Sequence, residues 1–144
     1  MPNFTDANKR NRMTTNANEI FTSLQFARTE ALRRGGNVSV GPLDGINWVS
    51  GIAVFTDGNG NSKYDDGEEI RVWGAFKTGT SLATIGGASV IVFDSRGFAA
   101  ANDDGSAAPS EEAFKLCDDR EGETGRKINL LMSGSVWIGD ANDC

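Results

Sequence analysis

The feature that most constrains this fold is an N-terminal stretch without a helix breaker. Between Asn3 and Arg34 there is no glycine or proline, and Pro2 stands at the tolerated edge of a helix. Apolar side chains recur at spacings of three and four, which predicts one amphipathic helix over this stretch, ended by Gly35 and Gly36. The predicted packing face consists of Ala17, Ile20, Leu24, Ala27 and Ala31, widened by Phe21 and Leu32.

The two halves of the predicted helix differ in polarity. From Thr5 to Asn18 the only apolar side chains are Met13 and two alanines, whereas the second half carries the packing face. A helix that is polar all round needs a different environment from a helix with an apolar stripe. We therefore expect the first half of the helix to project as an exposed stalk and the second half to pack against the rest of the domain. The whole helix would be about 45–50 Å long at the usual rise per residue.

The remainder of the chain predicts short strands separated by turns. The whole chain has 18 glycines against 3 prolines, which indicates many tight turns and a strand-rich body. We expect strands over residues 37–40, 48–55, 69–76, 89–94, 114–117, 127–132 and 136–138, and a polar loop over 101–112. Ile70, Val72 and Phe76 recur on a two-residue period within their strand, and Trp48, Ile52, Val54 and Phe55 are core candidates. The whole predicts one α+β domain over residues 1–144, with the long N-terminal helix packed on an antiparallel β-sheet.

Composition disfavours several functional classes. The net charge of −6 disfavours broad binding of phosphate backbones, and the absence of histidine removes the commonest general base and metal ligand. A nucleophilic serine would then need a lysine base, and no serine and lysine stand in a recognisable pairing. The acidic pairs at 111–112 and 118–119 lie in polar stretches typical of solvated loops. We expect no enzymatic activity.

The two cysteines, Cys117 and Cys144, predict a disulfide bond and an oxidising compartment. Their spacing matches no zinc motif, and the bond would tie down the C-terminus with a contribution of about 3–4 kcal/mol. The alternative is a pair of reduced thiols in a cytosolic protein. No apolar run approaches the roughly 20 residues that span a bilayer. We therefore expect the chain to be a soluble portion of a longer subunit.

Several short motifs follow one another in a set order. The helix carries LQFARTEA at 24–31, and a valine-containing strand at 37–40 and Trp48 precede GIAVFTD at 51–57. An Asn- and Gly-rich loop with an acidic run at 65–68, the FDSRG turn at 93–97 and the paired cysteines complete the series. In this order and spacing the chain resembles the GspH/FimT family of type IV pilin-like proteins.

The resemblance implies a structural role in a filament. Family members begin with a hydrophobic helix that anchors the subunit first in the inner membrane and then in the filament core, and we expect that segment to be missing here. The implied function is that of a minor type IV pilin in a tip or initiation complex that primes filament assembly. Its partners would be other minor pilins, pseudopilins and the major pilin. It would face the periplasm from the inner membrane and then enter the surface pilus. The alternative is a minor pseudopilin of type II secretion.

A further alternative is DNA binding for natural transformation, which some FimT-type members perform. Binding in that group relies on a basic C-terminal segment, whereas residues 133–143 here contain no Lys or Arg. Arg28, Arg33 and Arg34 are interpreted as cations favourably placed near a helix C-terminus, with surface pairing between Arg28 and Glu30. Nucleic acid is therefore disfavoured as a partner.

One loop has the spacing of a calcium site. Oxygen ligands fall at positions 1, 3, 5, 9 and 12 of an EF-hand-like series, namely Asp57, Asn59, Asn61, Asp65 and Glu68. Ser62 stands where the sharp turn favours glycine, and the flanks predict strands. The alternative is a long hairpin loop whose Asp, Asn and Gly residues supply turn conformations. Calcium, in an adhesin-like module, is the one cofactor that the spacing allows, and otherwise none is expected.

Overall fold

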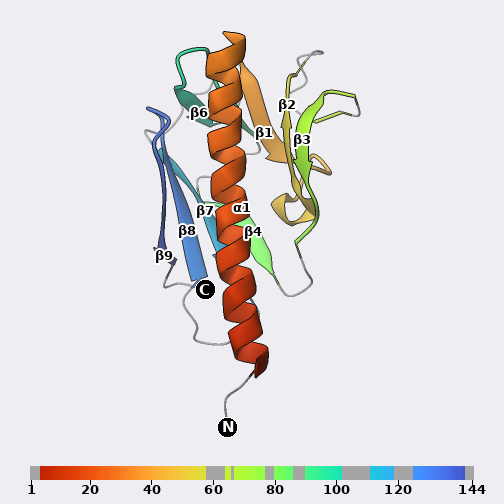
Figure 1. The fold of residues 1–144 in the computed structure, drawn as a ribbon, viewed down its shortest axis with the longest axis vertical. Coiled ribbons are helices and arrows are strands. Elements are labelled where there is room, and N and C mark those ends of the chain that lie inside the picture. The colour runs from red at the N-terminus through yellow and green to blue at the C-terminus, as the bar shows by residue number, and fades with distance from the viewer. Residues whose placement is uncertain are drawn as a thin grey trace.

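A computed structural model describes residues 4–57, 64–65, 67–76, 80–85, 90–101, 111–118 and 125–141. Helix α1 (Phe4–Arg34) is followed by a short 3₁₀ turn, η1 (Trp48–Ser50), and by strands that pair antiparallel throughout. Figure 1 shows α1 running lengthwise across the strands. The predicted helix and the α+β class, a long N-terminal helix on antiparallel sheet structure, are confirmed.

The strands form two sheets where one was expected. Their bounds are β1 (Val38–Pro42), β2 (Ile52–Phe55), β3 (Glu69–Trp73), β4 (Ser81–Thr84), β5 (Ile91–Phe93), β6 (Ala99–Ala101), β7 (Glu111–Cys117), β8 (Gly125–Leu131) and β9 (Val136–Ala141). The first sheet has the order β3-β2-β1-β5-β6 and the second β4-β7-β8-β9. In Figure 1, β1, β2 and β3 of the first sheet lie to the right of α1 and β6 lies to its left, and β7, β8 and β9 of the second sheet also lie to its left.

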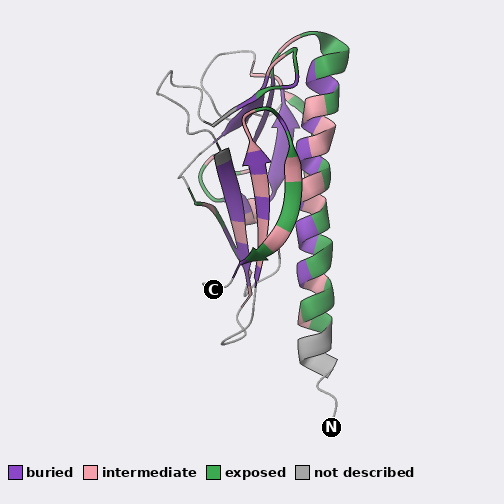
Figure 2. Cartoon of the chain, turned by 90° about the vertical axis from the view of Figure 1, so that its left-hand side faces the viewer, coloured by how far each residue is buried: buried purple, intermediate pink, exposed green. Residues whose placement is uncertain are grey.

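One face of α1 packs against both sheets. Ala17, Ile20, Leu24, Ala27 and Ala31 are each at most 2% exposed, so the structure buries all five residues of the predicted packing face. They share one core with Val40, Ile91 and Phe93 of the first sheet and with Phe114, Leu116, Ile128 and Leu130 of the second. Figure 2 shows the buried positions of α1 on the side that faces the strands. The helix is therefore the element that joins the two sheets into one core.

The buried face of α1 differs from the predicted packing face at both ends. It is narrower at the C-terminal end of the helix and extends further toward the N-terminus. Leu32 is 48% exposed, so its predicted place on the packing face is wrong, whereas Met13 is buried at 3%. At the usual rise, the 31 residues of α1 span about 46 Å. The first turns of the helix extend past the ends of the strands (Figure 1), which fits the polarity of this part of the sequence.

The last turn of α1 is stabilised by ion pairs and by backbone hydrogen bonds. The N–H of Gly35 donates to Ala31 O at 2.9 Å. The carboxylate of Glu30, a residue only 8% exposed, accepts from Arg33 at 2.7 Å and from Arg34 at 2.9 Å. The Arg33 guanidinium, with Arg34 beside it, holds the pKa of the Glu30 carboxyl below its usual value.

This cluster predicts a pH-dependent contribution to stability. A carboxyl whose folded-state pKa is lowered stabilises the fold above its unfolded pKa, about 4.3 for Glu, and loses that contribution as the pH falls through the folded value. We expect wild type to unfold at higher urea concentration than Glu30→Gln at pH 7, with the difference shrinking between about pH 5 and pH 3. A difference that stays constant over this range would contradict the assignment.

The predicted strand over residues 48–55 is wrong in its first half. Residues 48–50 form η1, and the extended strand begins only at Ile52. Between them Gly51 has φ 124°, and a Cβ placed there would lie 2.5 Å from Trp73 O, so only glycine lets the chain turn this close to β3. Trp48 is buried at 5% all the same and packs edge-on against Phe114 at 4.8 Å between ring centroids.

Other differences concern strand ends and exposure. The predicted strand over 69–76 ends at Trp73, and Val72 is 39% exposed, whereas Ile70 and Phe76 pack on the core. Strands β4 and β6 were not predicted. Of the polar loop predicted over 101–112, β6 includes Ala101 and β7 begins at Glu111, while residues 102–110 lie outside the described part.

Candidate functional site

The calcium-loop hypothesis falls partly outside the described residues. Asn59 and Asn61 are not among them, whereas Asp57, Asp65 and Glu68 are. The Glu68 Oε1 accepts a hydrogen bond from Asp65 N–H at 3.0 Å. Within the described ranges no three His, Cys, Asp or Glu side chains gather as a metal-binding group. Calcium binding stays a prediction, and its test is calorimetric titration with calcium before and after Asp57→Ala.

The cysteine prediction likewise reaches past the described part. Cys117 closes β7, is 6% exposed and is not a free thiol. Its predicted partner Cys144 lies outside the described residues. The Cys117–Cys144 bond therefore stays a prediction.

Arg28 lies where a turn of the first sheet meets a turn of the second. Its Nε donates to Gly97 O at 3.1 Å, in the turn between β5 and β6. A Cβ on Gly134, in the turn between β8 and β9, would lie 2.6 Å from the same Nε. The Ala99 N–H also donates across the seam to Met132 O at 2.8 Å. The expected pairing of Arg28 with Glu30 is wrong, because Arg28 lies on the side of α1 that faces these turns.

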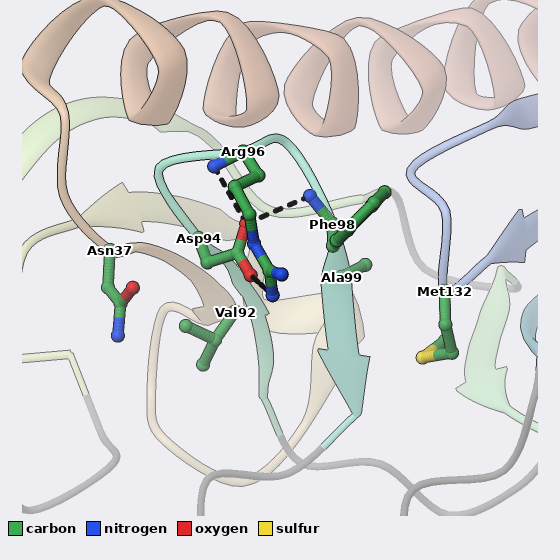
Figure 3. A pocket seen from close by; sticks show the side chains of 7 residues that line it. All are labelled: Asn37, Val92, Asp94, Arg96, Phe98, Ala99 and Met132. Atoms are coloured by element: carbon green, nitrogen blue, oxygen red, sulfur yellow. Dashed lines mark hydrogen bonds and ion pairs between the residues drawn. The ribbon is translucent and has the colours of Figure 1, made fainter.

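A small pocket opens beside this seam. Figure 3 shows its lining, which consists of Asn37, Val92, Asp94, Arg96, Phe98, Ala99 and Met132. Asp94 accepts hydrogen bonds from the backbone N–H of Arg96 at 2.9 Å and of Phe98 at 3.1 Å, and its other oxygen pairs with the Arg96 guanidinium at 2.9 Å. The charged groups of Asp94 and Arg96 therefore stabilise the β5–β6 turn. The apolar side chains of Val92, Phe98 and Met132 remain as the surface that the pocket offers to a ligand or partner.

A second groove lies between α1 and β3, the edge strand of the first sheet. Its walls are Thr15, Asn18, Glu19 and Thr22 of the helix and Arg71 and Trp73 of the strand. The Arg71 guanidinium carbon lies 4.6 Å from the ring centroid of Trp73 and 5.6 Å from that of Phe26. Since Arg71 stacks on these rings, it covers apolar surface at this edge.

The most exposed tryptophan, Trp137, lies on β9, an edge strand of the second sheet. Trp48 is buried and Trp73 is half-buried, whereas Trp137 is 44% exposed on β9, next to Ile138 at 37%. The sequence offered no means of choosing among the three tryptophans. A partly exposed tryptophan in an edge strand is typical of a contact surface.

The whole arrangement is a helix with an exposed polar face, two sheets whose edge strands include β3 and β9, and small surface pockets. Within the described residues no helix has the length and apolar content needed to cross a bilayer. The family model described as "Type II transport protein GspH" matches residues 16–134. This chain belongs to the GspH family. The match runs from the middle of α1 to the turn before β9, and therefore includes the first sheet and strands β4, β7 and β8 of the second sheet of this GspH-family protein.

Solved structures support the fold of the family member. The type IV minor pilin FimU of Pseudomonas aeruginosa is 20% identical, with a TM-score of 0.73 over 91% of this chain and 90% of that chain. A second crystal form of FimU is 18% identical, with a TM-score of 0.70 over 88% and 91% of the two chains. No curated protein matches the sequence. At these identities the likeness shows the pilin fold, and both family and fold are those of structural pilins.

Proposed function

We propose that this GspH-family protein is a minor subunit of a type IV pilus and that it acts in the complex that primes filament assembly. The observation that carries the proposal is the division of α1. One face of its C-terminal part is buried against two sheets, and its first turns, polar in sequence, extend beyond them (Figure 1). A helix placed in this way can be bundled with similar helices while the sheets stay on the outside of the bundle.

The proposed partners are other minor pilins and the major pilin. The protein would face the periplasm from the inner membrane before it enters the surface filament. The test is co-purification with the pilin-like subunits encoded beside it, followed by counting of surface pili in a strain without the protein. We expect a stable complex with other minor subunits and few or no pili. Normal pilus numbers together with no complex would refute the proposal.

The second candidate is a minor pseudopilin of type II secretion, which the match to a family of type II transport proteins favours. The same helix and sheets would serve that role, because both machines build helical bundles of pilin-like subunits. The two candidates differ in phenotype. Loss of an exported protein from the medium with unchanged pili would select secretion, and loss of pili with normal export would select the pilus.

A further inference from the structure

The groove between α1 and β3 brings one carboxylate, one guanidinium and several uncharged polar groups to a single surface. Its helix wall carries the carboxylate of Glu19, and its strand wall carries the guanidinium of Arg71 beside the half-buried Trp73. The other helix residues of the lining, all exposed, are Thr15, Asn18 and Thr22. The groove therefore offers hydrogen-bond donors, hydrogen-bond acceptors and an aromatic ring to one ligand.

The two charged groups of this groove are available to a ligand. Neither the Glu19 carboxylate nor the Arg71 guanidinium forms a hydrogen bond or an ion pair with another residue in the described part of the chain. Arg71 is nevertheless held in place, because its guanidinium carbon lies 4.6 Å from the ring centroid of Trp73 and 5.6 Å from that of Phe26. Since the N–H groups of a guanidinium lie in its plane, stacking on these rings leaves them free to donate.

A row of uncharged polar side chains continues from the groove along α1. Its members are exposed and stand three, four or seven positions apart, so they share one face of the helix. This uncharged row consists of Asn11, Thr15, Asn18, Thr22 and Thr29. At the usual rise per residue it is about 27 Å long. Hydroxyl and amide groups in such a row suit an elongated, uncharged ligand that both donates and accepts hydrogen bonds.

The charges of the groove select against ionic and purely apolar ligands. An anion would be repelled by the Glu19 carboxylate, and a cation would be repelled by the Arg71 guanidinium. A hydrocarbon would take water from both groups without replacing its hydrogen bonds. A neutral polyhydroxylated ligand can donate to Glu19, accept from Arg71 and place C–H groups on the exposed part of Trp73. Sugars have this combination of groups.

An extended peptide fits the same surface less well. It would have to pair with the edge of β3, whose register with β2 shifts between Val54↔Arg71 and Phe55↔Glu69. Such an irregularity interrupts the even spacing of free N–H and C=O groups that an added strand requires. The helix wall offers side chains only, because its backbone groups are bonded within α1. A glycan bonds to side chains and needs no strand edge.

We infer that the groove between α1 and β3, together with the uncharged row, binds a linear neutral oligosaccharide. Glu19 accepts hydrogen bonds from sugar hydroxyls, Arg71 donates to sugar oxygens, and Trp73 contacts the C–H face of one ring. The uncharged row binds the adjoining sugar units. The inference goes beyond the proposed function and does not depend on it. An N-acetylated glycan of the cell wall and a glucan outside the cell share this chemistry, and the test separates them.

The experiment follows the backbone amide NMR signals of the isotope-labelled chain during titration with chitotetraose, cellotetraose and maltotetraose. We expect saturable shifts with at least one of these sugars, located at Thr15, Asn18, Arg71 and Trp73. Binding of chitotetraose alone would identify an N-acetylated glycan, and binding of a glucose tetramer alone would identify a glucan. The uncharged peptide GTNTSTG is the competing ligand and should cause no saturable shift in the groove.

Variants of the groove test the roles of its side chains. Glu19→Ala and Arg71→Ala should each raise the dissociation constant of the bound sugar about tenfold, because each removes a hydrogen bond to a charged group. Asn18→Ala should raise it severalfold. Asn37→Ala makes the same change at an exposed residue of the other pocket and should stay within about twofold of wild type.

Several outcomes would overturn the inference. These are no saturable shift with any of the sugars, shifts confined to residues outside the groove, an unchanged dissociation constant in both Glu19→Ala and Arg71→Ala, or equal binding of the peptide. Shifts of the uncharged row that follow the concentration of the protein, and not that of the sugar, would assign the row to a contact between subunits and would also overturn it. Circular dichroism identifies a variant that has unfolded, and the position of the shifts in wild type decides the matter even then.

Discussion

Replacing Gly134 with alanine is expected to lower the free energy of unfolding by about 3 kcal/mol. Gly134 has φ 96°, in a region that side chains with a Cβ rarely adopt, and its Cβ would lie 2.2 Å from Gly97 O and 2.6 Å from Arg28 Nε. The backbone strain and the overlap with another backbone add, because neither turn can withdraw without breaking the seam between the two sheets. Urea denaturation followed by circular dichroism measures the loss.

Gly139→Ala is the matched control for this change. Gly139 is also in the C-terminal hairpin, but an added Cβ there would find its nearest atom, Asn129 Nδ2, at 3.6 Å, which is ordinary contact. We expect a loss below about 1 kcal/mol for Gly139→Ala. Equal stabilities of the two variants would show that the β8–β9 turn does not lie against Gly97 as described.

The second large effect is expected for Leu24→Ala, which should cost about 3 kcal/mol, within a usual range of 2–5. Leu24 is fully buried in the middle of α1, in the core shared by both sheets. The truncation leaves a cavity that neither sheet can fill alone, since the helix backbone is held along its length by small residues such as Ala27 and Ala31. The loss should appear in the same denaturation experiment.

Leu32→Ala provides the control on the same helix. It removes the same atoms from a side chain that is 48% exposed, and we expect a change within about 0.5 kcal/mol. Because both substitutions are Leu→Ala within α1, the change in helix propensity is almost the same for both. A large loss of unfolding free energy for Leu32→Ala, or a small one for Leu24→Ala, would contradict the assignment of which face of α1 packs against the sheets.

The helix could be predicted from the sequence because its evidence is local. A stretch without breakers, a stripe at spacings of three and four, and Gly35 at the end all act within a few turns. Strands with continuous apolar runs, such as β5 with its three buried residues, were equally visible. The resemblance added the order of the elements, and the pilin fold followed from it.

The remaining features depend on contacts between distant parts of the chain. Nothing near Arg28 in sequence indicates that its partner is Gly97, and Glu30 two positions later offered a nearer and misleading choice. Strands β4 and β6 are short and contain mostly small or polar residues, so their pairing with β7 and β5 decides their conformation. The exposure of Val72 and Trp137 depends on which strands end as sheet edges, and this is a property of the whole topology.

The way α1 spans both sheets has a mechanical consequence. A pull along the axis of this helix acts on two sheets at once, through the one core that side chains such as Ile20 and Leu24 share with both. To slide out, the helix would have to break these contacts together and not in succession, and Arg28 would hold the far end until its bond to Gly97 failed. Tension on the stalk should therefore be resisted by shear of the entire core.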